Sequence, residues 1–242
     1  MSSNCGWPAV RYEKPGKGVL RERKVRSVSK RGAYLDSLRE TFDCAFRVLT
    51  SERFRKMEGL GNEVPFFVLR YKPEWEPTVD EELSRLRRRL REERYRLADV
   101  DVFALAVDMW KASPFFDQML AMGKTLPPET FRDALSKVID VEGLLAPAIK
   151  EAVDEAGGED SVDAVLLSGV HHLFPLVRTH LLLNCLQPLL GSVPLVVTFP
   201  GSYHQSPSTH SALVLFDQIS QDNYYRAFDL VDFSLTLEPS AN

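Results

Sequence analysis

The sequence of 242 residues has few cysteines and no long apolar run. Its three cysteines, Cys5, Cys44 and Cys185, are far apart and form no CxxC pair, which argues against a disulfide scaffold or a zinc ribbon. The longest apolar stretches, such as 64–69 and 102–107, are too short to span a membrane. The N-terminal segment also lacks the apolar core of a secretory signal. We therefore expect a cytoplasmic protein with reduced thiols.

Charge is distributed unevenly along the chain. The net charge of −4 gives no general reason to expect nucleic acid as a partner. Residues 1–32, however, are rich in glycine, serine and basic residues without apolar periodicity, which predicts a flexible extension. Its basic residues suggest direct DNA contact as one interpretation, and they include Arg21, Arg23, Lys24 and Arg26. We favour the other interpretation, a solvated leader, because the rest of the chain is acidic.

From residue 33 onward, helical and strand-like patterns alternate. A helix is predicted from about Tyr34, and further helices at 80–97, where Thr78 or Asp80 is a candidate cap, at 114–157 in pieces, and at 174–190. Strands are predicted at 64–71, 99–110, 162–170, 193–201, 211–219 and 223–231. The arginines of the helix at 80–97 alternate with glutamates, which favours a solvent-exposed face with salt bridges over a nucleic-acid surface.

This alternation predicts an α/β fold: a single three-layer domain over 33–235 with a mainly parallel sheet. The segment 114–157 forms a helical insertion in this scheme, and 236–242 forms a tail. The last two predicted strands leave no room for a crossover helix, so an antiparallel edge is plausible.

The loops that follow the predicted strands lack the glycines of a nucleotide site. "KPEWEPTV" follows Tyr71 and contains two prolines where a P-loop needs GxxxxGK[ST], and "GLGN" at 59–62 precedes its strand. No GxGxxG is present either. We therefore expect a topology like that of P-loop NTPases but without a Walker A motif, and no bound cofactor.

No complete catalytic set is apparent. Asp108 lies near the end of the second predicted strand, where an acid can bind magnesium, but a cap for the next turn is the favoured reading. Ser168 lacks the flanking glycines of a GxSxG elbow. Cys185 follows the apolar pattern of its helix and is predicted to be an inert core thiol. No catalytic residue is predicted.

The histidines cluster in "SGVHHLFPLVRTHLLLN" at 168–184. His171 and His172 are neighbours and are predicted to point in different directions, while His180 lies eight residues beyond His172 with no Cys or Glu to complete a zinc set. His204 and His210 sit in a separate loop. No metal site is predicted.

Two long segments carry a family resemblance. "VLLSGVHHLFPLVRTHLLLNCLQPLLGSVPLVVTFPGSY" and then "LVLFDQISQDNYYRAFDL" resemble the C-terminal signature of the BrxB family, small proteins of the BREX bacteriophage-exclusion systems. "GLGNEVPFFVLRY" agrees more loosely, so that the resemblance spans roughly residues 34–232. The sequence departs from the family at His171 and His172, where smaller or acidic residues would be expected.

The resemblance implies a non-enzymatic component of a phage-defence system, an adaptor or assembly factor that binds a PglZ-like partner, with other BREX components as further candidate partners. The family-like polar positions become candidate partner-binding residues: Arg178, His180, Asn184, Tyr203, Tyr224, Tyr225 and Arg226. Tyrosine and arginine are enriched in interface hot spots. The alternative is a nucleotide-sensing or phosphoryl-transfer or nuclease-type enzyme that uses the strand-end loops, with Asp108, Arg178 and His180 as candidates.

Overall fold

A mainly parallel sheet organises the part of the chain that the computed structural model describes, which is residues 35–57, 65–158, 160–191, 193–204, 212–221 and 227–234. Five strands lie side by side and are parallel, in the order β2 (Leu97–Asp101), β3 (Ala164–Ser168), β4 (Leu195–His204), β1 (Phe66–Tyr71) and β7 (Phe228–Asp229). β5 (Ala212–Leu215) pairs antiparallel with the end of β4, and β6 (Ile219–Gln221) pairs antiparallel with β5. The predicted α/β class with a mainly parallel sheet is confirmed, and an antiparallel extension is present.

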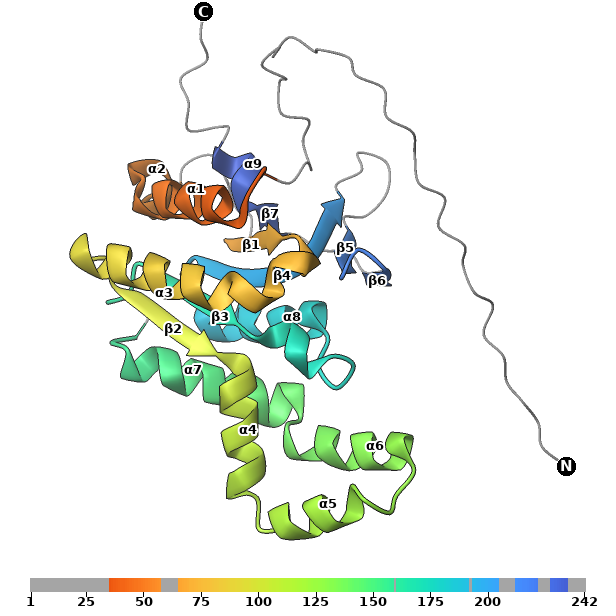
Figure 1. The fold of residues 1–242 in the computed structure, drawn as a ribbon. Coiled ribbons are helices and arrows are strands. Elements are labelled where there is room, and N and C mark those ends of the chain that lie inside the picture. The colour runs from red at the N-terminus through yellow and green to blue at the C-terminus, as the bar shows by residue number, and fades with distance from the viewer. Residues whose placement is uncertain are drawn as a thin grey trace, which may run out of the picture. The chain divides into compact units, whose positions relative to one another are not determined.

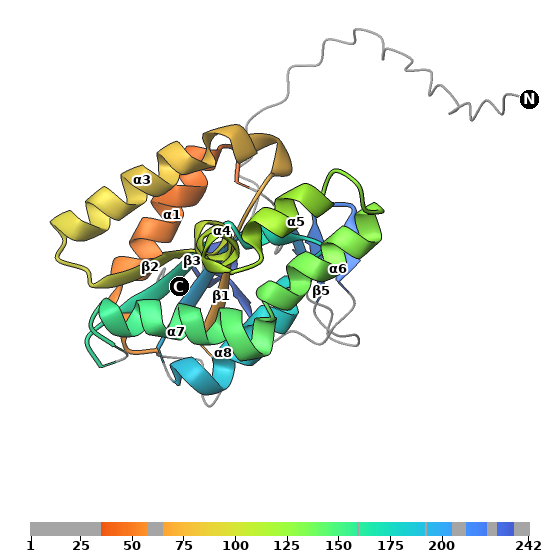
Figure 2. The ribbon, with the colours of Figure 1, turned by 90° about the horizontal axis from the view of Figure 1, so that it is seen from below.

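Helices cover both faces of the sheet (Figures 1 and 2). One face packs against α1 (Leu38–Thr50), α3 (Glu76–Glu92) and α9 (Leu230–Ser234), with α2 (Glu52–Arg55) beside α1. The other face packs against α7 (Ala146–Glu155), α8 (Thr179–Leu190) and the first half of α4 (Val102–Ala112). Alternate residues of β1 divide between the two cores, which is the period of two that a strand imposes. Three layers are therefore present, as the strand and helix patterns predict.

A group of short helices leads away from the sheet. α4 connects β2 to α5 (Phe116–Met122) and α6 (Pro128–Val138), and a π-helical turn at Val141–Leu145 returns the chain to α7 (Figure 1). We call the segment Phe115–Val138, which contains α5 and α6, the helical arm. None of the residues of α6 is fully buried, and Met119 is the buried residue of α5. Two 3₁₀ turns follow strands of the sheet, at Pro73–Trp75 and Val170–Leu173.

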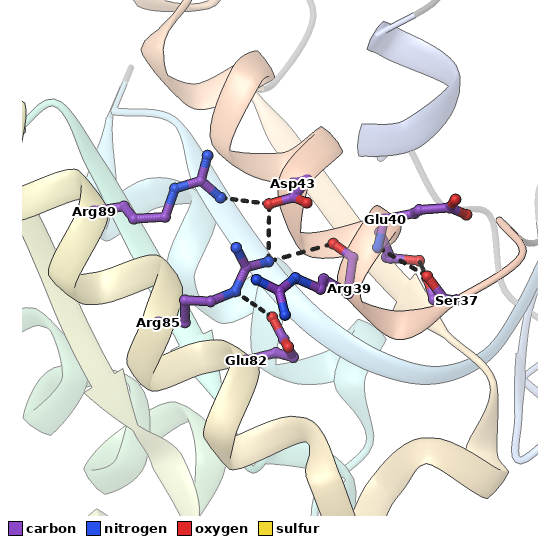
Figure 3. A network of polar contacts seen from close by, with 8 residues as sticks. Ser37, Arg39, Glu40, Asp43, Glu82, Arg85 and Arg89 are labelled. Carbon is purple, nitrogen blue, oxygen red and sulfur yellow. Dashed lines mark hydrogen bonds and ion pairs between the residues drawn. The ribbon is translucent and has the colours of Figure 1, made fainter.

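The arginines of α3 form ion pairs with α1, as Figure 3 shows. Asp43 of α1 accepts from Arg85 at 2.8 Å and from Arg89 at 2.5 Å, and Arg85 also contacts Glu82 at 2.6 Å. Burial alone would raise the pKa of Asp43, but the hydrogen bonds from the two arginines outweigh it and hold that pKa below its ordinary value. The predicted salt bridges are present for these residues, but the two arginine side chains are half-buried and not fully solvent-exposed, and Asp43 comes from another helix.

Within the sheet, Arg70 of β1 is buried and forms an ion pair with the buried Asp229 of the neighbouring strand β7. The other oxygen of Asp229 accepts from the backbone N–H groups of Val231 at 2.8 Å and Asp232 at 3.0 Å, which is the bonding of a helix cap. One carboxylate thus holds the edge strand β7 against β1 and begins α9.

The predicted strand at 99–110 is wrong over most of its length. β2 ends at Asp101, and the apolar residues that follow form α4, because a short apolar run fits a buried strand and a buried helix equally well. Asp108 is therefore no strand-end acid: it is exposed on α4, 3.3 Å from Lys111. The acid at the strand end is Asp101, whose side chain accepts from Ala104 N at 2.9 Å and caps α4.

Other boundaries differ by a few residues. α3 begins at Glu76, so neither Thr78 nor Asp80 is its cap, and it ends before Leu97, which belongs to β2. α8 begins at Thr179 and not at 174. Pro175 disfavours helical backbone at the residue before it, and Phe174 is extended at the end of a 3₁₀ turn. The segment predicted as a final strand at 223–231 contains the short β7 and the start of α9.

Several predictions concern parts of the chain outside the described residues. These are the flexible extension at 1–32, the tail at 236–242, and the segment "GLGN" at 59–62. In the ranges that are described, no helix combines the length and the apolar character that a membrane span requires.

Candidate functional site

Two strand-end segments meet at one edge of the sheet. β1 ends at Tyr71, and a 3₁₀ turn leads into α3, whose first residue is Glu76. β3 ends at Ser168, and the next 3₁₀ turn carries His171 and His172. Since the carboxyl ends of parallel strands point the same way, these segments lie at the edge where open α/β sheets bind ligands.

Glu76 is the centre of a group of polar contacts, which we call the Glu76 cluster: Tyr71, Glu76, His171 and His172. Oε1 of Glu76 lies 2.7 Å from Nε2 of His171 and 3.3 Å from Nε2 of His172. Its other oxygen, Oε2, accepts a hydrogen bond of 2.6 Å from the hydroxyl of Tyr71. The side chain of His171 is 4% exposed, that of Glu76 29% and that of His172 48%, so the cluster extends from the core to the solvent.

The prediction that the neighbouring histidines point in different directions is wrong. Their ring centroids lie 4.0 Å apart, and both Nε2 atoms reach the same carboxylate oxygen. Successive residues of a 3₁₀ turn leave the backbone about 120° apart. The imidazole rings nevertheless extend far enough from the backbone to converge on Glu76. The prediction considered the directions of the Cβ atoms and not the reach of the rings.

Gly169 allows the turn that carries the two histidines. Its φ of 73° lies in the left-handed region, which residues with a Cβ rarely adopt. A Cβ at this position would lie 2.8 Å from Oδ1 of Asp101 and 3.1 Å from Cβ of Phe103. The turn therefore packs directly against the junction of β2 and α4, and Phe103 also contacts the ring of His172, with centroids 5.4 Å apart.

Burial and hydrogen bonds determine the protonation of the side chains in the cluster. Burial would raise the pKa of Glu76, but the hydrogen bonds from His171 and Tyr71 outweigh it and hold that pKa below its ordinary value. Burial and the adjacent His171 lower the pKa of His172. Burial raises the pKa of Tyr71, and the hydrogen bond to Glu76 raises it further. At neutral pH the cluster thus contains a carboxylate, a neutral His172 and a protonated phenol.

The cluster brings three potential ligand atoms together, since one atom each of Glu76, His171 and His172 lie within 4.8 Å of one another. Sequence reasoning missed Glu76, because it looked for a third ligand near the histidines along the chain. The available signal was structural: two segments that each follow a parallel strand are expected to meet at one edge.

The predicted partner-binding residues are dispersed. Arg178, at the start of α8, and Asn184 are exposed, and His180 is half-buried between them. Tyr203 is buried in β4, and its hydroxyl donates to the carbonyl of Ala227 at 2.6 Å, so it supports the fold from inside. Tyr224, Tyr225 and Arg226 lie outside the described residues, as do Arg21, Arg23, Lys24 and Arg26.

Large exposed apolar side chains are concentrated in the stretch of chain that runs from α4 through the helical arm to the turn that follows it. Of the seven large apolar side chains that are exposed in the described residues, five belong to this region: Phe103, Phe115, Leu120, Met122 and Leu144. Phe115 is 59% exposed and Leu120 53%. Exposed apolar patches on soluble domains commonly mark interaction surfaces.

Comparison with known proteins places these features in context. The family model described as BREX protein BrxB matches residues 98–230. A BREX protein BrxB from Bacillus cereus (strain H3081.97) is 29% identical over 196 residues, which cover 81% of this chain and 98% of that relative. A BREX protein BrxB from Escherichia coli O9:H4 (strain HS) is 34% identical over 183 residues, which cover 76% of this chain and 86% of that relative. No solved structure shows significant similarity to the chain.

Proposed function

This chain belongs to the BrxB family of BREX proteins, and we propose that within a BREX phage-defence system it acts as an adaptor or assembly factor, and not as an enzyme, by binding a larger PglZ-like partner. The family membership supports the defence context. The exposed apolar side chains of the helical arm support a role in protein–protein contact.

The helical arm is the main support for the proposal, because apolar surface in contact with water is energetically unfavourable. Phe115 and Leu120 each expose more than half of their surface, and Met122 exposes 37%. Complete burial of a fully exposed apolar side chain of this size contributes about 1.5–3 kcal/mol, and roughly half of that applies to side chains that are half exposed. Aromatic and methionine side chains are also enriched at the centres of protein interfaces. A partner that covers the arm would therefore gain affinity from several side chains at once.

A second exposed surface, on one side of α8, would contribute polar contacts that make binding of the partner specific. On α8, Arg178, Leu181 and Asn184 are all exposed and follow one another at three-residue steps, which places them on one side of the helix. Leu181 is 45% exposed. This face contains two of the family-like polar residues, and we propose it as the rim that aligns the same partner.

A binding experiment tests the proposal. The full-length chain is co-expressed with a PglZ-like protein of a BREX system, and the affinity of the purified pair is measured by calorimetry. We expect a defined complex whose Kd rises at least about tenfold in the variant Phe115→Ser/Leu120→Ser, because hot-spot truncations typically cost 2 kcal/mol or more. Arg178→Glu should weaken the complex less, as expected for a residue at the rim.

Ile219→Ser is the matched control, since Ile219 is also apolar and is 37% exposed, but it lies on β6. This variant should bind like the wild type. A monomer that forms no complex with the PglZ-like protein would overturn the adaptor role. A complex that is indifferent to Phe115 and Leu120 but lost in the β6 variant would overturn the assignment of the surface.

A further inference from the structure

We propose that Glu76, His171 and His172 form a binding site for one divalent transition-metal ion of the zinc class. This site goes beyond the adaptor function and does not depend on it. The three residues come from two segments that are far apart in sequence, and their ligand atoms lie within 4.8 Å of one another.

The donor set matches the chemistry of zinc. Two imidazole nitrogens and one carboxylate oxygen are a frequent three-residue set for Zn²⁺, in which a water molecule takes the fourth position. Softer thiolate sites would need cysteine, and Mg²⁺ or Ca²⁺ would need mostly oxygen ligands. A pair of imidazoles beside one carboxylate therefore selects a transition metal over the alkaline-earth ions.

The three ligand atoms lie within 4.8 Å of one another, and their separations must adjust to those of a metal site before an ion fits. With metal–ligand bonds of about 2.0–2.2 Å in a tetrahedron, neighbouring ligand atoms lie roughly 3.3–3.5 Å apart. The separation of 3.3 Å between Glu76 Oε1 and His172 Nε2 already has this value. The 2.7 Å between Glu76 Oε1 and His171 Nε2 is a hydrogen-bond distance and must lengthen by about 0.6–0.8 Å when the ion replaces the proton.

The proton on Nε2 of His171 can move to the other ring nitrogen, Nδ1. When Nε2 binds the ion as a neutral imidazole, the proton resides on Nδ1. Nδ1 of His171 is buried and has no hydrogen-bond partner among the described residues. Moving the proton to Nδ1 therefore breaks no existing hydrogen bond on that side of the ring, but it creates a buried N–H donor that requires an acceptor such as a water molecule.

The surroundings of the three ligands suit a cation. The hydroxyl of Tyr71 donates to Oε2 of Glu76, which fixes the carboxylate and leaves Oε1 directed at the histidines. Asp80 and Asp101 are close enough to act electrostatically on His172 and add negative potential. His172 is about half exposed, so an ion can enter from solvent without opening the core.

The competing explanation is that the Glu76 cluster only fastens α3 to the turn after β3 through hydrogen bonds. A metal titration separates the two. The full-length protein is stripped with a chelator and titrated with ZnCl₂ by calorimetry, and with Co²⁺ while its visible absorption is recorded. We expect one ion per chain and the strong visible bands of four-coordinate Co²⁺.

Substitutions of Glu76 and His172 test whether these residues bind the ion. Glu76→Gln keeps the shape of the side chain but removes its charge, and His172→Ala removes a half-exposed ring; each should weaken Zn²⁺ binding at least about tenfold. Glu74→Gln is the matched control, because this carboxylate lies two residues away, is 71% exposed and contacts Lys72. It should leave both the affinity and the Co²⁺ spectrum unchanged.

His171→Ala is avoided because the ring is buried and its loss could unfold the turn. Circular dichroism and urea unfolding of Glu76→Gln and His172→Ala confirm that the metal-free variants are folded. The proposal is overturned by the absence of saturable Zn²⁺ and Co²⁺ binding, which leaves the hydrogen-bonded junction. It is overturned equally by binding that survives unchanged in both folded variants, because the ion would then be held elsewhere. Neither result bears on whether the chain binds a PglZ-like partner.

Discussion

Nε2 of His171 lies 2.7 Å from Oε1 of Glu76, although the two residues are 95 positions apart in the sequence. The contact joins the first turn of α3 to the turn that follows β3, so it ties together the connections of two parallel strands. The carboxylate also lies at the N-terminus of α3, where a negative charge is favoured by the helix dipole. One acidic residue thus serves helix formation and the assembly of the sheet edge.

The turn at Gly169 should tolerate no side chain. Gly169→Ala forces a Cβ into the left-handed region and to within 2.8 Å of Asp101 Oδ1. We expect the free energy of unfolding to fall by about 1–3 kcal/mol, measured from the urea midpoint at an unchanged slope. Gly143→Ala is the milder comparison: its φ is not in that region, and its Cβ would lie 2.9 Å from Oδ2 of Asp140, which accepts from the Gly143 N–H at 2.7 Å. We expect a smaller loss there, because only a side-chain cap must shift. A larger loss in the Gly143 variant would contradict this account of the turn.

The secondary structure can be predicted wherever the sequence pattern is compatible with only one type of element. β1, β3 and β4 are apolar runs bounded by turn residues, and α1 and α3 place their apolar residues on one side, so these elements were predictable. The run after Asp101 is compatible with a buried strand and with a buried helix, and packing against β3 and the turn after β3, not local preference, makes it α4.

The candidate site was harder to predict for a different reason. The histidine pair was visible in the sequence, but its partner Glu76 is specified by the order of the strands and not by spacing along the chain. A search for ligands at helical or loop spacing cannot find a residue that only sheet assembly brings near. The same holds for Asp43, which neutralises arginines of α3 that have glutamates of their own nearby.

The buried pair of Arg70 and Asp229 should be among the most sensitive positions. Asp229→Ala removes the carboxylate from beside a guanidinium that is 1% exposed, and it also removes the cap of α9. We expect a loss of about 3–5 kcal/mol in the free energy of unfolding, measured by urea denaturation. Asp108→Ala serves as the control, because its pair with Lys111 is exposed and should be worth about 0.5 kcal/mol or less. Equal losses in the two variants would show that the buried pair has no special role.

Asp163 should make stability depend on pH in the acid range. Its carboxylate accepts from the backbone N–H of Arg96 at 2.7 Å and from the guanidinium of Arg96 at 2.9 Å. Burial would raise the pKa of Asp163, but these bonds outweigh it and hold that pKa below its ordinary value. A depressed folded pKa contributes stability that is complete above the unfolded pKa of about 3.9 and is lost as the pH falls through the folded pKa.

The expected result is a flatter pH dependence in Asp163→Asn than in the wild type. Urea midpoints measured between about pH 6 and pH 3 should converge as the pH falls, because the wild type loses the contribution that the variant lacks. Asp133→Asn, at a side chain that is 70% exposed, should follow the wild-type curve. Parallel curves for the wild type and Asp163→Asn would refute the assignment.

The Glu76 cluster and the helical arm should be separable by mutation. Glu76→Gln removes a charge at the start of α3, whereas Phe115→Ser/Leu120→Ser changes exposed side chains at α5 and its N-terminal flank. We expect the first variant to lose Zn²⁺ affinity and to keep its affinity for the PglZ-like partner, and the second to do the reverse, both measured by calorimetry. If the two sites share no contacts, their effects are additive within about 0.5 kcal/mol, and the combined variant should show both losses undiminished.

Phe103 tests the boundary between the two surfaces, since it is exposed on α4 and also contacts the ring of His172. If Phe103→Ser weakens both Zn²⁺ binding and partner binding while Leu144→Ser weakens at most partner binding, the two sites communicate through α4. If Glu76→Gln alone abolishes the complex, the two sites are one, and the metal-binding edge is itself the docking surface.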